Sequence, residues 1–248
     1  MSFNYNFPIK LNISQTLFKP TSLKIKPNLR SQKDSFVSNP IYDSLSTKEQ
    51  IEQVSRANPQ IMNLLKRYDI PLQINIKELE NLKQGHMKDT RIITSKIYSA
   101  LPDDLKNNID LSSLQDAALL HDYGKVLIPL SVLNKTGKLT PKEQEIMELH
   151  SILGYELLKN KNLDRKTLAL IKYHHQNLAG TGYPEKMNDY EYDIATEILS
   201  VADKYSALRE KRSYKSPLAK YEALEIIAKD VNTGRLSQEI YTALLKSL

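Results

Sequence analysis

The sequence predicts an all-α domain that follows a disordered N-terminal tail. Three observations support this fold class. From residue 46 onward, apolar residues recur at the three- and four-residue spacings of amphipathic helices. The same part of the chain has no convincing alternation of apolar and polar residues and no Asn-Gly hairpin signal. Residues 1–45, in contrast, contain four prolines and no lasting helical pattern.

Residues 1–45 are predicted to be a disordered basic tail. They hold +4 of the chain's net charge of +6, and they contain neither Glu nor Gly. Such a segment cannot bury enough apolar area to offset the entropy lost on ordering it. The alternative is a docking arm that anchors on this protein or on a partner, because all four phenylalanines lie here (Phe3, Phe7, Phe18 and Phe36). A transit peptide is a further alternative, which the single arginine in this stretch argues against.

The remaining chain is predicted to comprise a helical extension at 46–84 and a domain at 85–248. The pattern at 47–69 is interrupted by Pro59, which predicts two short helices, and a helical pattern follows at 76–101. Gly124 is expected to stop a helix at 111–122. Later helices are predicted at 166–175, 193–209, 217–230 (started by Ser216-Pro217) and 237–247.

Thr140, Pro141 and Glu143 predict the start of another helix. They supply a threonine N-cap, a proline at the first helical position and the glutamate of a capping box. His150 falls on the apolar stripe of this helix.

Composition excludes several kinds of protein and site. The chain has no cysteine, so any metal must be held by imidazole and oxygen ligands. It has no run of 18 apolar residues and no signal-peptide core, so we expect a cytoplasmic protein without a membrane span. Because the net charge outside the tail is only +2, we expect no stable nucleic-acid binding.

The histidines form the most informative pattern. There are five (His86, His121, His150, His174 and His175), and four lie in or beside predicted helices near an apolar face. One such histidine is usually a core residue satisfied by hydrogen bonds. Five would need five sets of partners, whereas a metal cluster satisfies them together. Asp122 follows His121 directly, and Asp203 lies within an apolar helix where an unpaired carboxylate would be costly.

Three ordered blocks resemble the HD-GYP family of the HD phosphohydrolase superfamily. They are ALLHDYGKVLIPLSVLNKTGKLTPKEQEIMELH at 118–150, HHQNLAGTGYP at 174–184, and VADKYSALREKRSYK at 201–215. The resemblance extends from about residue 84 to residue 230. It implies an HD-domain helical bundle extended by C-terminal helices.

The resemblance also implies a site with two divalent transition-metal ions. His86, His121, Asp122 and Asp203 would hold one ion, and Asp122 would bridge to a second held by His150, His174 and His175. Iron or manganese is the first choice, with zinc or nickel as alternatives. Some family members carry a third ion with the help of a glutamate one turn before the first histidine. Leu82 occupies that position here, so we expect two ions.

The substrate implied by the resemblance is a cyclic dinucleotide, with cyclic di-GMP as the first choice. Asp122 and Lys125 would act in catalysis, and Lys125, Tyr183, Arg212 and Lys215 would bind the substrate. Four positions depart from the family pattern, namely Gln176, Ala179, Ser206 and Ser213. The alternatives are therefore a phosphohydrolase acting on another nucleotide or phosphoester, or a weakly catalytic nucleotide sensor that acts through partners. The sequence also leaves a homodimer open.

Overall fold

The computed structural model describes residues 45–184, 191–210 and 216–248. The predicted basic tail thus lies outside the described residues, except for Leu45. The Leu45 side chain is fully buried in the core, and its carbonyl accepts a hydrogen bond from the Tyr123 hydroxyl. The folded part of the chain therefore includes the last residue assigned to the tail.

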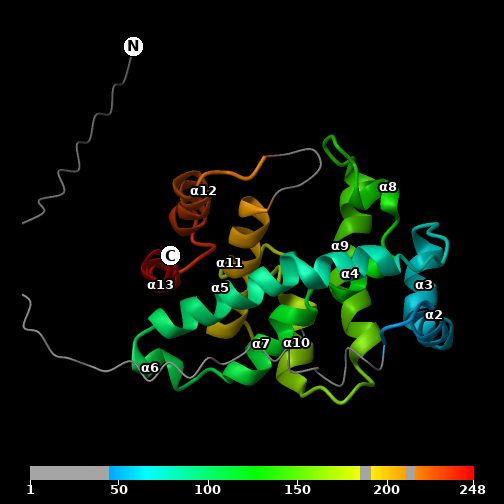
Figure 1. Cartoon of the computed structure of the whole chain (residues 1–248), viewed down its shortest axis with the longest axis horizontal. Helices are drawn as coiled ribbons and strands as arrows, with labels where there is room; N and C mark the ends of the chain where they lie inside the picture. Colours follow the sequence, from blue (N-terminus) through cyan, green and yellow to red (C-terminus); the bar gives the residue numbers. More distant parts are fainter. Residues whose placement is uncertain (1–44, 185–190, 211–215) are drawn as a thin grey trace, which may run out of the picture. The chain divides into compact units, whose positions relative to one another are not determined.

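The described residues form helices and no strands, which confirms the all-α prediction (Figure 1). The elements, labelled as in Figure 1, are α2 (Lys48–Ala57), α3 (Pro59–Arg67), α4 (Ile76–Gln84), α5 (His86–Ala100), α6 (Asp103–Lys106), α7 (Leu111–Leu120), the 3-10 helix η1 (Tyr123–Leu127), α8 (Leu130–Leu133), α9 (Pro141–Leu158), α10 (Arg165–Tyr173), α11 (Ile194–Arg209), α12 (Lys220–Asn232) and α13 (Gln238–Ser247).

Local signals set the start of several helices as predicted. Asn58 caps α3 ahead of Pro59, and Thr140 forms a complete capping box with Glu143 at the start of α9. The predicted start at Ser216-Pro217 is wrong. Residues 216–219 are not helical, and α12 begins only at Lys220, where Glu222 accepts a hydrogen bond from the backbone of Ala219.

The helical pattern at 76–101 corresponds to two helices that meet at Gly85. This glycine has φ −108° and ψ −103°, which is outside the helical region, and it separates α4 from α5. The sequence did not predict the break because apolar residues keep their spacing across it. The consequence is that His86 is the first residue of α5 rather than an interior helical residue.

A close backbone approach holds η1 against α9. A Cβ atom on Gly124 would lie 2.0 Å from the carbonyl oxygen of His150 and 2.4 Å from the amide nitrogen of Gly154. Only glycine permits this contact. The contact brings the His121-Asp122 pair, which immediately precedes η1, next to the middle of α9.

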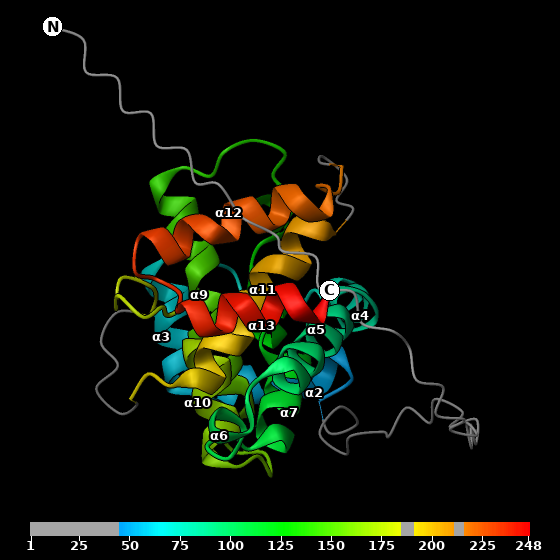
Figure 2. The same cartoon turned by 90° about the vertical axis from the view of Figure 1, so that its left-hand side faces the viewer.

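Helix α5 lies beside α7, α11 and α13, as both ribbon views show (Figures 1 and 2). Helix α9 packs on η1 and α10, and α3 and α2 contact α9 as well. The helices that contribute predicted site residues are therefore neighbours in one core, which contains Leu114, Leu153 and Ile198.

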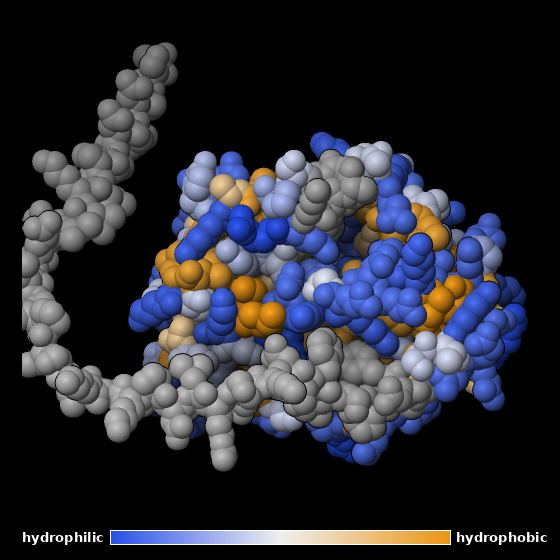
Figure 3. Space-filling view, in the orientation of Figure 1, coloured by the Kyte–Doolittle hydropathy of each residue, from blue (hydrophilic) through white to orange (hydrophobic). Residues whose placement is uncertain are grey.

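Hydrophilic residues predominate on the face shown in Figure 3, and hydrophobic ones form separate areas between them. Among the described residues, no helix has both the length and the apolar composition that crossing a membrane requires.

Candidate metal centre

The structure brings all seven predicted metal ligands together from five places in the chain. His86 begins α5, His150 lies within α9 and Asp203 lies in α11. His121 caps the C-terminus of α7 and is followed by Asp122. His174 likewise caps the C-terminus of α10 and is followed by His175. Six of the seven are buried, and the His175 side chain is 25% exposed.

One group of ligand atoms surrounds Asp203. The Asp203 Oδ1 atom lies 2.8 Å from Nε2 of His86 and 3.6 Å from Nε2 of His121. Nitrogen and oxygen atoms from these three residues lie within 4.8 Å of one another. They could hold one metal ion.

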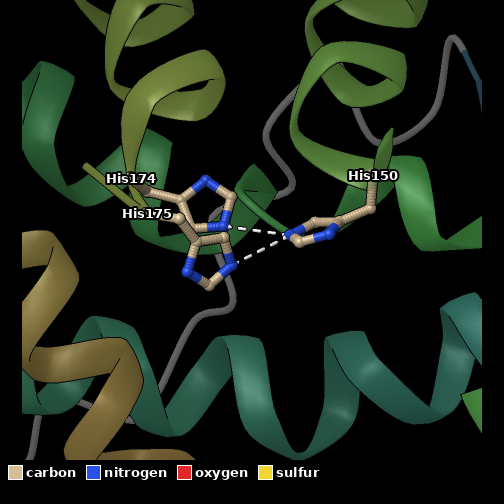
Figure 4. A group of neighbouring side chains, drawn as sticks. All are labelled: His150, His174 and His175. Atoms are coloured by element: carbon tan, nitrogen blue, oxygen red, sulfur yellow. Dashed lines mark hydrogen bonds between the residues drawn. The ribbon is translucent and has the colours of Figure 1, made fainter. Parts of the chain in front are cut away.

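A second group consists of His150, His174 and His175 (Figure 4). The His150 Nε2 atom lies 3.2 Å from Nε2 of His174 and 3.1 Å from Nε2 of His175. Figure 4 shows His150 facing the other two rings from a separate helix. These three nitrogens could hold another ion.

Asp122 lies between the two groups. Its Oδ2 atom is 3.4 Å from Nε2 of both His86 and His121, and its Oδ1 atom is 3.4 Å from Nε2 of His150. One carboxylate thus presents a different oxygen to each group. This is the arrangement that a bridging ligand requires.

Backbone carbonyls fix the orientation of three of the rings. The Nδ1 atoms of His121, His150 and His174 lie 2.7–2.9 Å from the carbonyl oxygen three residues earlier in each case. A carbonyl can only accept, so each Nδ1 carries the hydrogen and each Nε2 presents a lone pair when the ring is neutral. Two such lone pairs then face each other between His150 and His174. A cation between them would satisfy both, and the residues therefore fit a metal.

The histidines of the two groups differ in protonation when no metal is bound. Burial lowers the pKa of His150 to about 3 with added repulsion from His175, and burial lowers the pKa of His175 itself to about 4. Burial also opposes a charge on His121, but the Asp122 and Asp203 carboxylates outweigh it and raise the pKa of His121 to about 10. The second group is therefore neutral at pH 7, and the first holds a cation.

Both carboxyl groups are ionised. Burial alone would raise the pKa of Asp122, but the charges of Lys125 and His121 hold it well below its usual range. The nearby His121 ring and the hydrogen bond from His86 similarly outweigh the burial of Asp203 and lower its pKa. The centre thus offers two anionic ligands to a cation.

The loop that carries Tyr183 packs directly on His175. A Cβ atom on Gly182 would lie only 2.1 Å from the His175 carbonyl oxygen, so this position requires glycine. The approach places the Tyr183 ring over the His175 imidazole, with centroids 4.5 Å apart and planes inclined by 30°. Gln176 supports the same loop by donating a 2.7 Å hydrogen bond from Nε2 to the Pro184 carbonyl.

A cavity of about 600 Å³ opens on the centre. Its walls include the predicted residues His86, Lys125, His150, His175, Tyr183 and Asp203. They also include Glu78, Asn81, Asn134, Lys135 and Glu210, which the sequence did not single out. Asn134, Lys135 and Glu210 lie in recognisable blocks, whereas Glu78 and Asn81 do not. Those two reach the cavity through tertiary packing, which leaves no local pattern.

Arg212 and Lys215, the other two predicted substrate contacts, lie outside the described residues. Among the departures from the family pattern, Gln176 and Ser206 are buried and Ala179 is exposed. Leu82, at the position where a glutamate would favour a third ion, lines the cavity. The nearby carboxylate residue, Glu80, is exposed.

The chain is similar to known proteins in family, in fold and in sequence. The family described as "HD domain" matches residues 73–240. The solved structure of an HDG"Y"P protein from Bdellovibrio bacteriovorus aligns with a TM-score of 0.54 over 84% of this chain and 66% of that chain, at 18% identity. At that identity the match concerns the fold alone.

Two curated relatives share the central part of the sequence. The "Cyclic di-GMP phosphodiesterase" of Thermotoga maritima is 36% identical over 143 residues, which is 56% of this chain and 38% of the relative. The "3'3'-cGAMP-specific phosphodiesterase 3" of Vibrio cholerae is 30% identical over 164 residues, which is 66% of this chain and 35% of the relative. The matched region thus spans less than two fifths of the length of either relative.

Proposed function

The chain belongs to the HD-domain family, and from this premise we propose that it is a metal-dependent phosphodiesterase that hydrolyses a cyclic dinucleotide. Cyclic di-GMP is the first candidate substrate. The names of the two relatives support this class of substrate, since both are cyclic-dinucleotide phosphodiesterases.

One observation carries the proposal, namely that Asp122 turns its two oxygens toward two different groups of ligand atoms. His86, His121 and Asp203 would hold one ion with Asp122, and His150, His174 and His175 would hold the other. Bound there, two divalent ions supply an activated water and charge stabilisation for displacement at phosphorus.

The other side chains have roles that follow from where they lie. Lys125 reaches both Asp122 and the cavity, so its ammonium is available to a phosphoryl oxygen or a leaving group. Tyr183 covers His175 at the cavity wall and offers an aromatic face to a nucleotide. We assign Arg212 and Lys215 to the substrate phosphates by their resemblance to the family.

The ligand set favours a transition metal over calcium or magnesium. Five of the seven predicted ligands are imidazoles, which suit iron, zinc and nickel better than calcium or magnesium, and the two carboxylates also suit manganese. We propose iron or manganese as the physiological metal, with zinc or nickel as alternatives.

The decisive experiment combines metal analysis with turnover. Full-length protein is purified without chelators, its metal content is measured, and it is incubated with cyclic di-GMP and Mn²⁺ or Fe²⁺ under reducing conditions. We expect about two metal ions per chain and a linear product, both lost in the Asp122→Ala variant. A folded protein that binds no metal would refute the proposal.

Gln176 is the observation that favours the alternative of a nucleotide sensor. The family pattern has a carboxylate there, whereas the buried Gln176 amide brings no charge and uses its donor on Pro184. Tight binding of cyclic di-GMP without turnover would support the sensor. Turnover of another phosphoester alone would support a different phosphohydrolase.

A further inference from the structure

His86 differs from the other buried histidines in how its second nitrogen is satisfied. His121, His150 and His174 each donate Nδ1–H to a carbonyl three residues earlier. The Nδ1 atom of His86 is buried and has no hydrogen-bond partner among the described residues. The break at Gly85 explains the difference, because His86 begins α5 and has no preceding turn of the same helix behind it.

Two more polar atoms on the same helix are unpaired. Thr90 and Thr94 are fully buried, and neither Oγ1 has a hydrogen-bond partner within the described part of the chain. Other hydroxyls in α5 behave as helical hydroxyls commonly do. Ser95 and Ser99 each donate to the carbonyl four residues earlier, at 2.9 and 2.8 Å.

The spacing puts these polar atoms in one row. His86, Thr90 and Thr94 follow each other at intervals of four residues, so they share one face of α5. Side chains on a helix lean toward its N-terminus. The Thr90 side chain therefore covers the turn that carries His86, and Thr94 lies one turn farther away.

We propose that Thr90 is a positioning residue for the metal centre, with its hydroxyl accepting the Nδ1–H of His86 through one buried water, since the two atoms make no direct hydrogen bond. This inference rests on the proposed role of His86 as a metal ligand. The hydrogen bond fixes the proton on Nδ1 and holds Nε2 toward Asp203, which is 2.8 Å away. It gives His86 the support that the other three rings receive from backbone carbonyls.

Metal binding distinguishes this role from a purely structural one. Thr90→Val keeps the shape of the side chain and removes the hydroxyl, and Thr90→Ser restores the hydroxyl. Thr94→Val is the matched control, because it makes the same change on the same face one turn farther from His86. The affinity and stoichiometry of Mn²⁺ are measured by calorimetry on metal-free full-length protein, together with the melting temperature.

We expect Thr90→Val to weaken one of the two Mn²⁺ sites by about 10–100-fold, and Thr90→Ser to restore that site. Thr94→Val should bind Mn²⁺ like the wild type. If both valine variants bind two ions with wild-type affinity, the inference is wrong while the proposed metal centre stands. If the wild type binds no Mn²⁺, both fail. Should Thr90→Val not fold, Thr90→Ala provides the same readout.

Discussion

The Nζ atom of Lys125 lies 2.6 Å from Oδ2 of Asp122, the same oxygen that faces His86 and His121. The ammonium and a metal ion at this oxygen would repel each other. Loading of the centre should therefore move Lys125 away from Asp122 and into the cavity that it also lines. Metal binding would thereby deliver a positive charge to the place where the substrate phosphates would lie.

Lys125→Met should reduce kcat/KM for cyclic di-GMP by about 10²–10³-fold, because it removes a charge that stabilises the phosphoryl oxygens or the leaving group. Metal content should remain at the wild-type level, since the variant only removes a competitor for Asp122. Steady-state kinetics and metal analysis on the same sample test both points. Lys135→Met is the control, as Lys135 lines the cavity but pairs with Glu143. Loss of metal from Lys125→Met would contradict this role.

Asp122→Asn and Asp203→Asn should differ in how many ions they lose. Asp122 faces both groups of ligands through separate oxygens, so its variant should weaken both ions. Asp203 places Oδ1 near His86 and His121, whereas its Oδ2 lies 3.8 Å from Nδ1 of His175, the nitrogen that does not face His150. Its variant should therefore weaken one ion and leave about one per chain. Elemental analysis after gel filtration counts the ions. Equal losses in the two variants would argue against a bridging Asp122.

Metal binding should release a proton at the first group and none at the second. Because the pKa of His121 is raised to about 10, this ring is charged at pH 7 and must lose its proton to coordinate. His150 and His175, with pKa values lowered to about 3 and about 4, are already neutral. Calorimetry in buffers of different ionisation enthalpy should show at least one proton released per two ions at pH 7, with a further one if a bound water ionises. Binding of two ions without release of a proton would contradict this assignment.

The His121 imidazole should also make the stability of the metal-free protein depend on pH. The pKa of His121 is higher in the folded chain than the value of about 6.5 expected after unfolding. Its contribution to the free energy of unfolding is therefore complete below about pH 6.5 and is lost as the pH rises toward 10. Urea unfolding between pH 6 and 10 measures this loss. The slope should disappear in His121→Gln if the assignment is correct.

Gly124→Ala should destabilise the domain by more than about 3 kcal/mol, because its Cβ would lie 2.0 Å from a backbone oxygen that cannot move freely. Gly137→Ala is the matched control. A Cβ at that glycine would meet nothing within 4 Å, so the change should stay within about 0.5 kcal/mol. Urea unfolding measures both variants. A stable Gly124→Ala protein would mean that η1 and α9 can separate.

The sequence predicted those parts of the fold that depend on short-range chemistry. The capping box of Thr140 and Glu143 and the proline after Asn58 locate helix starts because cap and helix are adjacent in the chain. The break at Gly85 was not predicted because the apolar spacing continues across it, and the start of α12 at Lys220 was missed because the Ser216-Pro217 pair also resembles a helix start.

The residues of the candidate site likewise fall into those that local sequence patterns identify and those that only the folded structure identifies. Six of the seven predicted ligands could be named in advance because they fall in recognisable blocks, and His86 could be named as the one remaining histidine. The structure brings the seven together. Glu78 and Asn81 could not be named, because only the folded chain carries them to the cavity. Thr90 could not be named because its proposed role depends on the break at Gly85, which makes His86 the first residue of α5. Several points stay predictions, namely substrate binding by Arg212 and Lys215, partner binding by the tail, a homodimer and a cytoplasmic location.

The seven ligands come from segments that begin at residue 86 and end at residue 203. No short stretch of the chain holds more than two of them, so an unfolded chain cannot assemble either ion site. Each bound ion would therefore add its binding free energy to the folded state alone, by about 2.7 kcal/mol at a free concentration of 100 times its Kd. Removal of the metal would then lower the stability of the whole domain as well as its activity.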